Sequence, residues 1–223
     1  FRRPRRRGAT TGPRRFRLPA IGGSLKSIVA ALREAFANDG IRRLGISWML
    51  GVEADAALTV VLLVTAFNRG GILAAGLMGA VRYIPAIIAG MLAGTMVKRF
   101  RGDRFLVALG LIRALAAAGT AFTIATAGTT MDEKQVTIVL LFVWAAVAAG
   151  AGAPVRPTQI TLMPAIARSP RELVAANTVW TTGEGLGAFV GPFVAGALMA
   201  INLHSWVAGL AAVAFLLTAI ISA

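Results

Sequence analysis

Long apolar runs separated by short polar stretches make up most of the chain from Leu44 onward. Each run is close to the roughly 20 residues that an α-helix needs to cross about 30 Å of hydrocarbon. The runs predict six membrane-spanning helices, at residues 44–67, 71–97, 105–127, 136–154, 173–200 and 205–223. Continuous apolar runs differ from the alternating pattern of a membrane β-barrel. The predicted fold class is therefore all-α, a polytopic membrane helical bundle over residues 41–223.

A shorter, amphipathic pattern precedes these runs. Its apolar positions recur at helical spacing and are Leu25, Ile28, Val29, Leu32 and Phe36. The pattern predicts a helix over 25–40 that lies in the membrane interface, with a protein-binding helix as the alternative. Residues 1–24 are rich in Arg, Gly and Pro and contain no acid, which predicts a disordered basic arm on the cytoplasmic side.

The composition agrees with a membrane protein, because 57% of the residues are hydrophobic and only 14% are charged. The chain has no cysteine and one histidine, which excludes disulfides, thiolate metal sites and histidine metal clusters. The sequence also lacks a phosphate-binding loop and any recognisable catalytic motif. We therefore expect no enzyme, no metal and no cofactor, and an ion gradient as the energy source.

The basic residues predict an orientation. Lys and Arg outnumber Asp and Glu by 23 to 9, and most of them precede the first run or lie in two of the loops. These loops contain Lys98, Arg99, Arg101 and Arg104, and Arg156, Arg168 and Arg171, whereas the opposite side has Arg69 and Lys134. By the positive-inside rule both termini are cytoplasmic, in a multi-pass protein of the inner or plasma membrane. The basic arm is expected to meet anionic lipid head groups, and nucleic acid is not expected as a partner.

The loop between the second and third runs carries a motif, GTMVKRFRGDR, from Gly94 to Arg104. It resembles the loop motif of the major facilitator superfamily of transporters. The residues that carry the resemblance are Gly94, Lys98, Arg99, Gly102, Asp103 and Arg104. The motif departs from the family at three places: Lys98 takes the position of an Asp that helps latch the outward-open state, Gly102 comes one residue late, and Asp103 replaces a basic residue.

A second motif, GAFVGPFVAG, lies in the fifth run. It is similar to the antiporter motif of the same superfamily, GxxxGPxxGG, with Ala195 in place of one Gly. The motif residues are Gly187, Gly191, Pro192 and Gly196. Small residues four apart let helix backbones approach closely in lipid, and Pro192 permits a kink. The resemblance implies the exporter branch, which expels drugs or siderophores.

The resemblance extends over residues 38–223 and implies the first six helices of a twelve-helix fold. In that fold two six-helix halves enclose a substrate cavity, so the implied partner is a second half or a second copy of this chain. The abrupt ends of the sequence favour a truncated chain over a half-sized transporter.

Charged residues inside the apolar runs are candidate functional groups, because each costs at least about 2.5–3.5 kcal/mol near the bilayer centre. Glu53 and Asp55 are about 200° apart around a helix and cannot both face one cavity. We prefer Asp55 as the carboxylate that faces the cavity, with Arg82 as its candidate partner. Three alternatives stay open: a substrate-responsive ion pair, a static salt bridge between spans, and an unpaired Asp55 that carries protons.

Two further charged residues lie in the runs. Glu184 shares a helix face with Gly187 and Gly191, which predicts a proton or cation site, or a carboxylate that hydrogen-bonds a neighbouring helix. Arg113 is expected to be partly hydrated near the cytoplasmic side and to brace the loop motif. Trp48 is expected to anchor its helix at the membrane interface.

These observations favour a secondary active transporter that couples proton entry to the efflux of a small amphipathic or cationic compound. The alternative is a non-transporting membrane anchor or scaffold with a lipid-binding basic arm. Replacing Asp55 and Glu184 by their amides separates the two, because only transport depends on membrane carboxylates.

Overall fold

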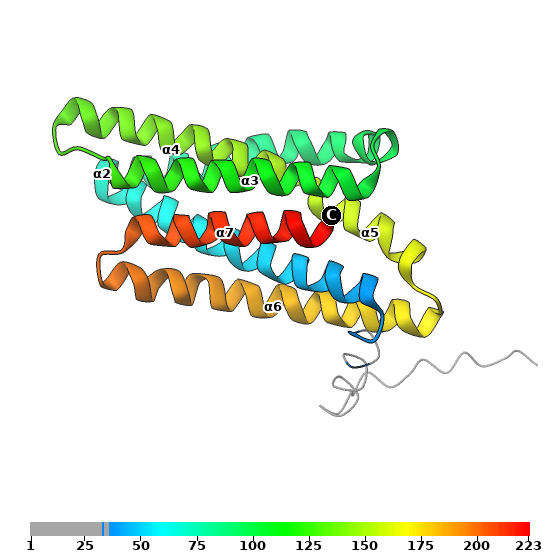
Figure 1. The fold of residues 1–223 in the computed structure, drawn as a ribbon. Helices are drawn as coiled ribbons and strands as arrows, with labels where there is room; N and C mark the ends of the chain where they lie inside the picture. The colour runs from blue at the N-terminus through cyan, green and yellow to red at the C-terminus, as the bar shows by residue number, and fades with distance from the viewer. Residues whose placement is uncertain (1–32, 34–35) are drawn as a thin grey trace, which may run out of the picture.

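The computed structural model describes residues 33 and 36–223, and it contains helices and no strands in this part of the chain (Figure 1). The helices are α2 (Asp39–Arg99), α3 (Gly102–Ala125), α4 (Met131–Gly152), α5 (Val155–Ile166), α6 (Pro170–Ala200) and α7 (His204–Ser222). The predicted arm at 1–24 lies outside the described residues, as does most of the predicted interfacial helix at 25–40.

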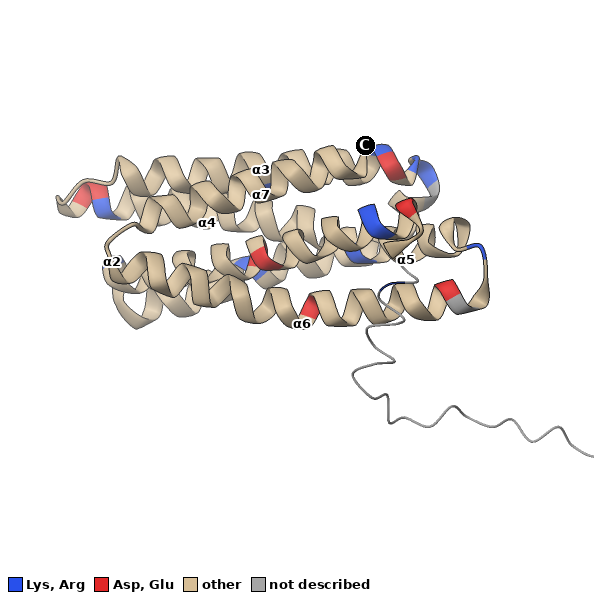
Figure 2. Ribbon diagram, turned by 60° about the horizontal axis from the view of Figure 1, so that its bottom comes forward, with Lys and Arg blue, Asp and Glu red and all other residues tan. Residues whose placement is uncertain are grey.

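Within the described residues, five helical segments are long and apolar enough to cross a membrane. They are residues 39–97 in α2, all of α3, residues 131–166, which comprise α4 and α5 together, residues 172–200 in α6, and all of α7. Figure 2 shows that most of the charged residues lie near the ends of the bundle, with only a few along its length. These features indicate a multi-pass membrane protein.

The long helix α2 folds back on itself at Gly71. A straight helix of its 61 residues would be about 90 Å long. Instead, Gly71 has φ 68° and ψ −162°, a backbone conformation that is essentially restricted to glycine. Asp55 and Arg82, one from each arm, are consequently in contact at 3.1 Å, and the two arms run antiparallel in Figure 1. The arms correspond to the first two predicted apolar runs.

The first arm of α2 begins at Asp39, two residues before the predicted boundary at 41. Asn38 caps this helix, because its Oδ1 accepts a hydrogen bond from the backbone N–H of Gly40 at 3.1 Å. The Asn38 amide also donates to the Ile166 carbonyl and to Glu172 Oε2, each at 3.2 Å. One side chain thus ties the start of α2 to the end of α5 and the start of α6.

The helix α5 was not predicted from the sequence. The fourth run was expected to end at 154 and to be followed by a basic loop, but residues 155–166 form a second helix that runs obliquely to α4 (Figure 1). Pro154 has no backbone N–H and interrupts the helix, while its fixed φ suits the residue that precedes a new helix. The prolines and arginine of this segment are typical of a loop, and this concealed the helix.

The core lies where the two arms of α2 pack against α3, α4 and α7. Its fully buried large side chains include Leu58, Leu62, Met78, Leu141 and Phe215. Many large apolar side chains on the outside are exposed instead, among them Ile72, Met91, Phe122, Phe189 and Phe193. Exposed apolar surface on this scale is expected where lipid surrounds a bundle.

The start of α2 and the carboxyl end of α7 lie at the same end of the bundle (Figure 1). Ser47 and Ser222 demonstrate this, since their hydroxyl oxygens are 3.0 Å apart. The Ser47 hydroxyl also donates to the carbonyl of Thr218 at 3.3 Å. An even number of passes along the bundle therefore separates Asp39 from the last residue.

Candidate functional site

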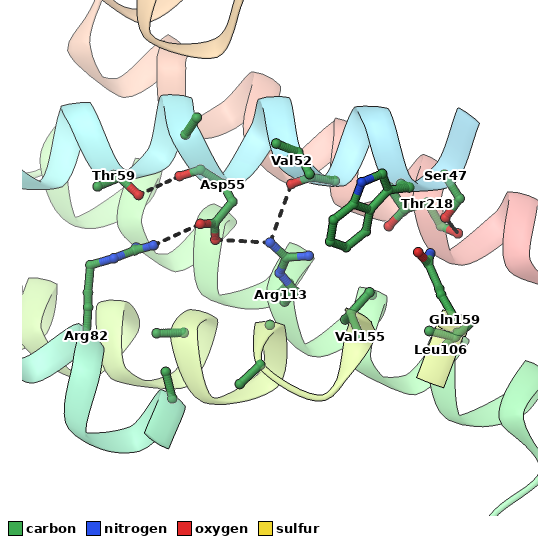
Figure 3. A pocket seen from close by; sticks show the side chains of 18 of the residues that line it. Ser47, Val52, Asp55, Thr59, Arg82, Leu106, Arg113, Val155, Gln159 and Thr218 are labelled. Atoms are coloured by element: carbon green, nitrogen blue, oxygen red, sulfur yellow. Dashed lines mark hydrogen bonds and ion pairs between the residues drawn. The ribbon is translucent and has the colours of Figure 1, made fainter. Parts of the chain in front are cut away.

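A cavity of about 500 Å³ lies among both arms of α2, α3, α4, α5 and α7 (Figure 3). Its walls are largely apolar and contain three charged side chains, Asp55, Arg82 and Arg113. Polar wall residues include Ser47, Thr59, Gln159 and Thr218. The cavity is thus a place where residues from different helical segments bring ionised groups together.

Asp55 accepts hydrogen bonds from two arginines. Its Oδ2 lies 3.1 Å from Nη2 of Arg82, and its Oδ1 lies 3.0 Å from Nη2 of Arg113. The three residues come from the first arm of α2, the second arm of α2 and α3 (Figure 3). The predicted contact between Asp55 and Arg82 is therefore present, and it forms part of a triad that joins three helical segments.

The structure corrects the expectation for Arg113. This residue is 7% exposed and does not contact the described residues of the loop motif through an ion pair or hydrogen bond. Its guanidinium carbon lies 4.0 Å from the centroid of the Phe215 ring, a cation–π contact that helps hold the side chain in place. The sequence offered no signal for this pairing, because Arg113 and Asp55 are 58 positions apart.

Several buried polar atoms of residues that line the cavity have no hydrogen-bond partner among the residues that the structure describes. They are Nη1 of Arg82, Nε of Arg113, Nε1 of Trp48 and Oε1 of Gln159. Trp48 lines the cavity and packs edge-on against Trp180, with ring centroids 5.0 Å apart. Trp48 therefore belongs to the cavity wall, and its expected role as an interface anchor stays a prediction.

The two other candidate carboxylates lie elsewhere. Glu53 is not part of the cavity wall, which agrees with the expectation that it and Asp55 face different directions. Glu184 lies in a separate groove between α5 and α6, where its Oε1 is 3.3 Å from Nη1 of Arg156. Because both side chains of this pair are about half exposed, the pair is a surface feature of the described chain.

The antiporter-like motif lies in α6, where two of its glycines contact the first arm of α2. A Cβ added at Gly187 would lie 3.0 Å from the backbone nitrogen of Glu53. A Cβ added at Gly191 would meet the carbonyl oxygen of Glu53 and would lie 2.9 Å from Cβ of Ala56. The predicted close approach is thus observed at these two glycines, whereas a Cβ added at Gly196 would meet no described atom of another helix within 4 Å. Pro192 lies inside α6.

The loop motif is at the end of the bundle, where α2 joins α3. Asp103 forms an exposed ion pair with Arg101 at 3.2 Å. Gly102 packs against Leu162 of α5, and Gly94 has open space around it. The candidate residues Lys98, Arg99 and Arg104 belong to the same connection at this end of the bundle. Lys98 and Arg99 are the last residues of α2, and Arg104 lies in the first turn of α3.

Among the described residues, no group of three or more His, Asp or Glu side chains could hold a metal ion. Comparison of the chain with protein-family models, with curated proteins and with solved structures gives no match.

Proposed function

We propose that this protein is a secondary active transporter in which the cavity around Asp55 forms part of the solute path. The observation that carries the proposal is the triad of Asp55, Arg82 and Arg113 beside a cavity of about 500 Å³ inside apolar helices. Ionised groups at such depth are costly and are found mainly where a path or a relay needs them. A simple membrane anchor has no need of such groups.

The proposed topology has six crossings. The two arms of α2 each exceed the length needed to span a membrane, and with α3, the joined α4 and α5, α6 and α7 they account for all six. We place the start of α2 and the carboxyl end of α7 on the cytoplasmic side, because the positions of the basic loops predict this orientation. The basic arm at 1–24 would then meet anionic lipid.

The proposed mechanism uses the proton affinity of a carboxylate. Protonation of Asp55 would remove its charge and release the guanidinium groups of Arg82 and Arg113, which could then bind solute or rearrange. For the cavity to open to each side of the membrane in turn, this six-helix unit would have to rock against a second one, either another half of the protein or a second copy of the chain. The resemblance of residues 187–196 to the antiporter motif supports efflux as the direction.

Flux measurements on the full-length protein in lipid vesicles test this proposal. A panel of radiolabelled organic cations, anions and neutral compounds is tested with an imposed pH gradient. We expect at least one compound to move in response to the gradient, and an uncoupler to abolish the movement. Asp55→Asn should remove gradient-driven flux, whereas Glu184→Gln, outside the cavity, should keep it.

Exchange of solute without a gradient serves as the control for folding. An Asp55→Asn protein that still exchanges solute, but no longer responds to the gradient, has lost coupling and not structure. Wild-type flux that is unaffected by the uncoupler would contradict proton coupling. Membrane recruitment of a cytoplasmic protein with no flux of any compound would favour the anchor or scaffold function instead.

A further inference from the structure

The cavity wall carries an excess of positive charge. Its described charged side chains are the two arginines, Arg82 and Arg113, and the single carboxylate of Asp55. Glu53 and Glu184 do not contribute, because neither lines this cavity. An uncompensated charge among apolar helices is unfavourable, so an occupant that carries one negative charge would neutralise the site.

Within the described chain, four polar atoms of the wall residues have no hydrogen-bond partner; three are N–H donors and one, Oε1 of Gln159, is an acceptor. The three buried donors are Nη1 of Arg82, Nε of Arg113 and Nε1 of Trp48, and none of them is paired with a described residue. Buried polar groups are almost always hydrogen-bonded, so two guanidinium groups with unused N–H donors in one cavity wall favour an occupant that carries acceptor atoms. Arg113 is 7% exposed and Gln159 is 1% exposed, which makes them fixed parts of the wall and not mobile surface side chains.

We infer that this cavity binds a small organic monoanion, whose carboxylate or phosphate oxygens accept hydrogen bonds from Arg82 and Arg113. Guanidinium groups match the planar, paired oxygens of such anions. The apolar wall, which includes Leu63, Leu106 and Val155, suits a hydrocarbon or aromatic body. The inference rests on the proposed transport function and replaces the cationic compound expected from the sequence.

The structure predicts that substitution of the carboxylate and substitution of either arginine in the triad have opposite effects on anion binding. Asp55 holds both guanidinium groups, so it and a bound anion would compete for the same two arginines. Loss of Asp55 should therefore strengthen anion binding, whereas loss of an arginine should weaken it. A merely structural triad would give weaker binding in both cases.

Binding to the full-length protein in detergent tests the inference. The probes are benzoate and diphenyl phosphate as anions, benzamide as a neutral analogue and benzylammonium as a cation. Their binding is followed by calorimetry and by intrinsic tryptophan fluorescence, to which Trp48 of the cavity wall contributes. We expect the anions to bind at least about tenfold more tightly than the other two, as a charge-assisted hydrogen bond would provide. Arg82→Gln should weaken anion binding about tenfold, and Asp55→Asn should strengthen it.

Arg156→Gln is the matched control, because Arg156 pairs with a carboxylate outside the cavity, and it should leave anion binding unchanged. Tighter binding of benzylammonium than of both anions would overturn the inference, as would equal binding of all four probes. Anion binding that a folded Arg82→Gln protein retains in full would also overturn it. Anion binding without gradient-driven flux would contradict only the proposed transport, whereas gradient-driven flux of cations alone would contradict only the inference.

Discussion

Asp55 is the residue on which the ionic triad depends. Its carboxylate lies between two arginines that would otherwise face each other without a counter-charge. Its backbone is held as well, because the hydroxyl of Thr59 donates to the Asp55 carbonyl at 2.6 Å. The side chain is 37% exposed, which leaves it accessible from the cavity while Arg113 is almost fully enclosed. This combination allows a bound group or a proton to reach the carboxylate.

We predict that Asp55→Asn destabilises the folded bundle by about 3–5 kcal/mol, because it leaves buried guanidinium groups uncompensated. Thermal unfolding of the detergent-solubilised protein measures the change. Adding Arg113→Met to this variant should restore part of the loss, since it removes one of the unpaired charges. Glu184→Gln should cost less than Asp55→Asn, because Glu184 has a single arginine partner and both side chains of this pair are about half exposed. Equal losses in the two single variants would contradict the central role of Asp55.

The sequence identified Arg113 as a candidate functional residue but did not identify its partner. Its position in an apolar run marked it as a group that needs a partner or a function. Its partner could not be deduced, because the contact depends on the rotation of α3 against α2. Arg82 was easier to pair with Asp55, since adjacent antiparallel segments bring such residues to similar depths.

At the scale of elements, close packing of α6 on the first arm of α2 depends on two glycines. Gly187 and Gly191 bring the helices so near that an added methyl group would press on backbone atoms of Glu53. Dispersion forces are the main attraction between helices in lipid, and they require such proximity. Backbone atoms cannot move aside as side chains do, so this face tolerates no larger residue without a shift of a helix.

We predict that Gly191→Ala destabilises the protein by about 1–3 kcal/mol, the usual cost of overpacking. Gly196→Ala is the matched control from the same motif, because nothing lies within 4 Å of its added Cβ. The control should be neutral or stabilising by up to about 1 kcal/mol, since alanine favours a helix. Thermal unfolding of the two variants measures the difference. Similar losses in both would show that helix packing is not the cause.

The elements α2 and α5 illustrate different limits of prediction. The hydropathy minimum around Arg69 and Gly70 located the fold-back in α2, because polar and glycine residues interrupt an apolar run. The helix α5 was missed, since its prolines and arginine resemble those of a loop. Thr158 and Gln159 are buried against the bundle, and this burial stabilises the helix. Because it depends on tertiary packing, it could not be predicted from local helix propensity.

At the scale of the whole molecule, the distribution of charge provides a test of topology. The chain contains no cysteine, so a single introduced cysteine is the sole thiol. Phe100 and Thr129 are both exposed and flank α3 at its two ends. In intact cells, a membrane-impermeant maleimide should label Thr129→Cys, whereas Phe100→Cys should react only after permeabilisation. Neither substitution changes the charge of a loop.

Labelling of both cysteines from the same side would show that α3 does not cross the membrane, and it would contradict the six-crossing topology. Labelling of Phe100→Cys alone would reverse the proposed orientation but keep the crossing. The two outcomes thus separate the number of crossings from their direction.

Hydropathy is a sum over neighbouring residues, and for this reason the apolar runs alone located the long helices to within a few residues. The same local character explains why the close approach at Gly187 and Gly191 could be anticipated. Contacts among residues far apart in the chain depend on how helices rotate and pack, which no local sum contains. Only the folded bundle therefore placed Arg113 on Asp55, moved Glu184 to an outer groove and enclosed a positively charged cavity.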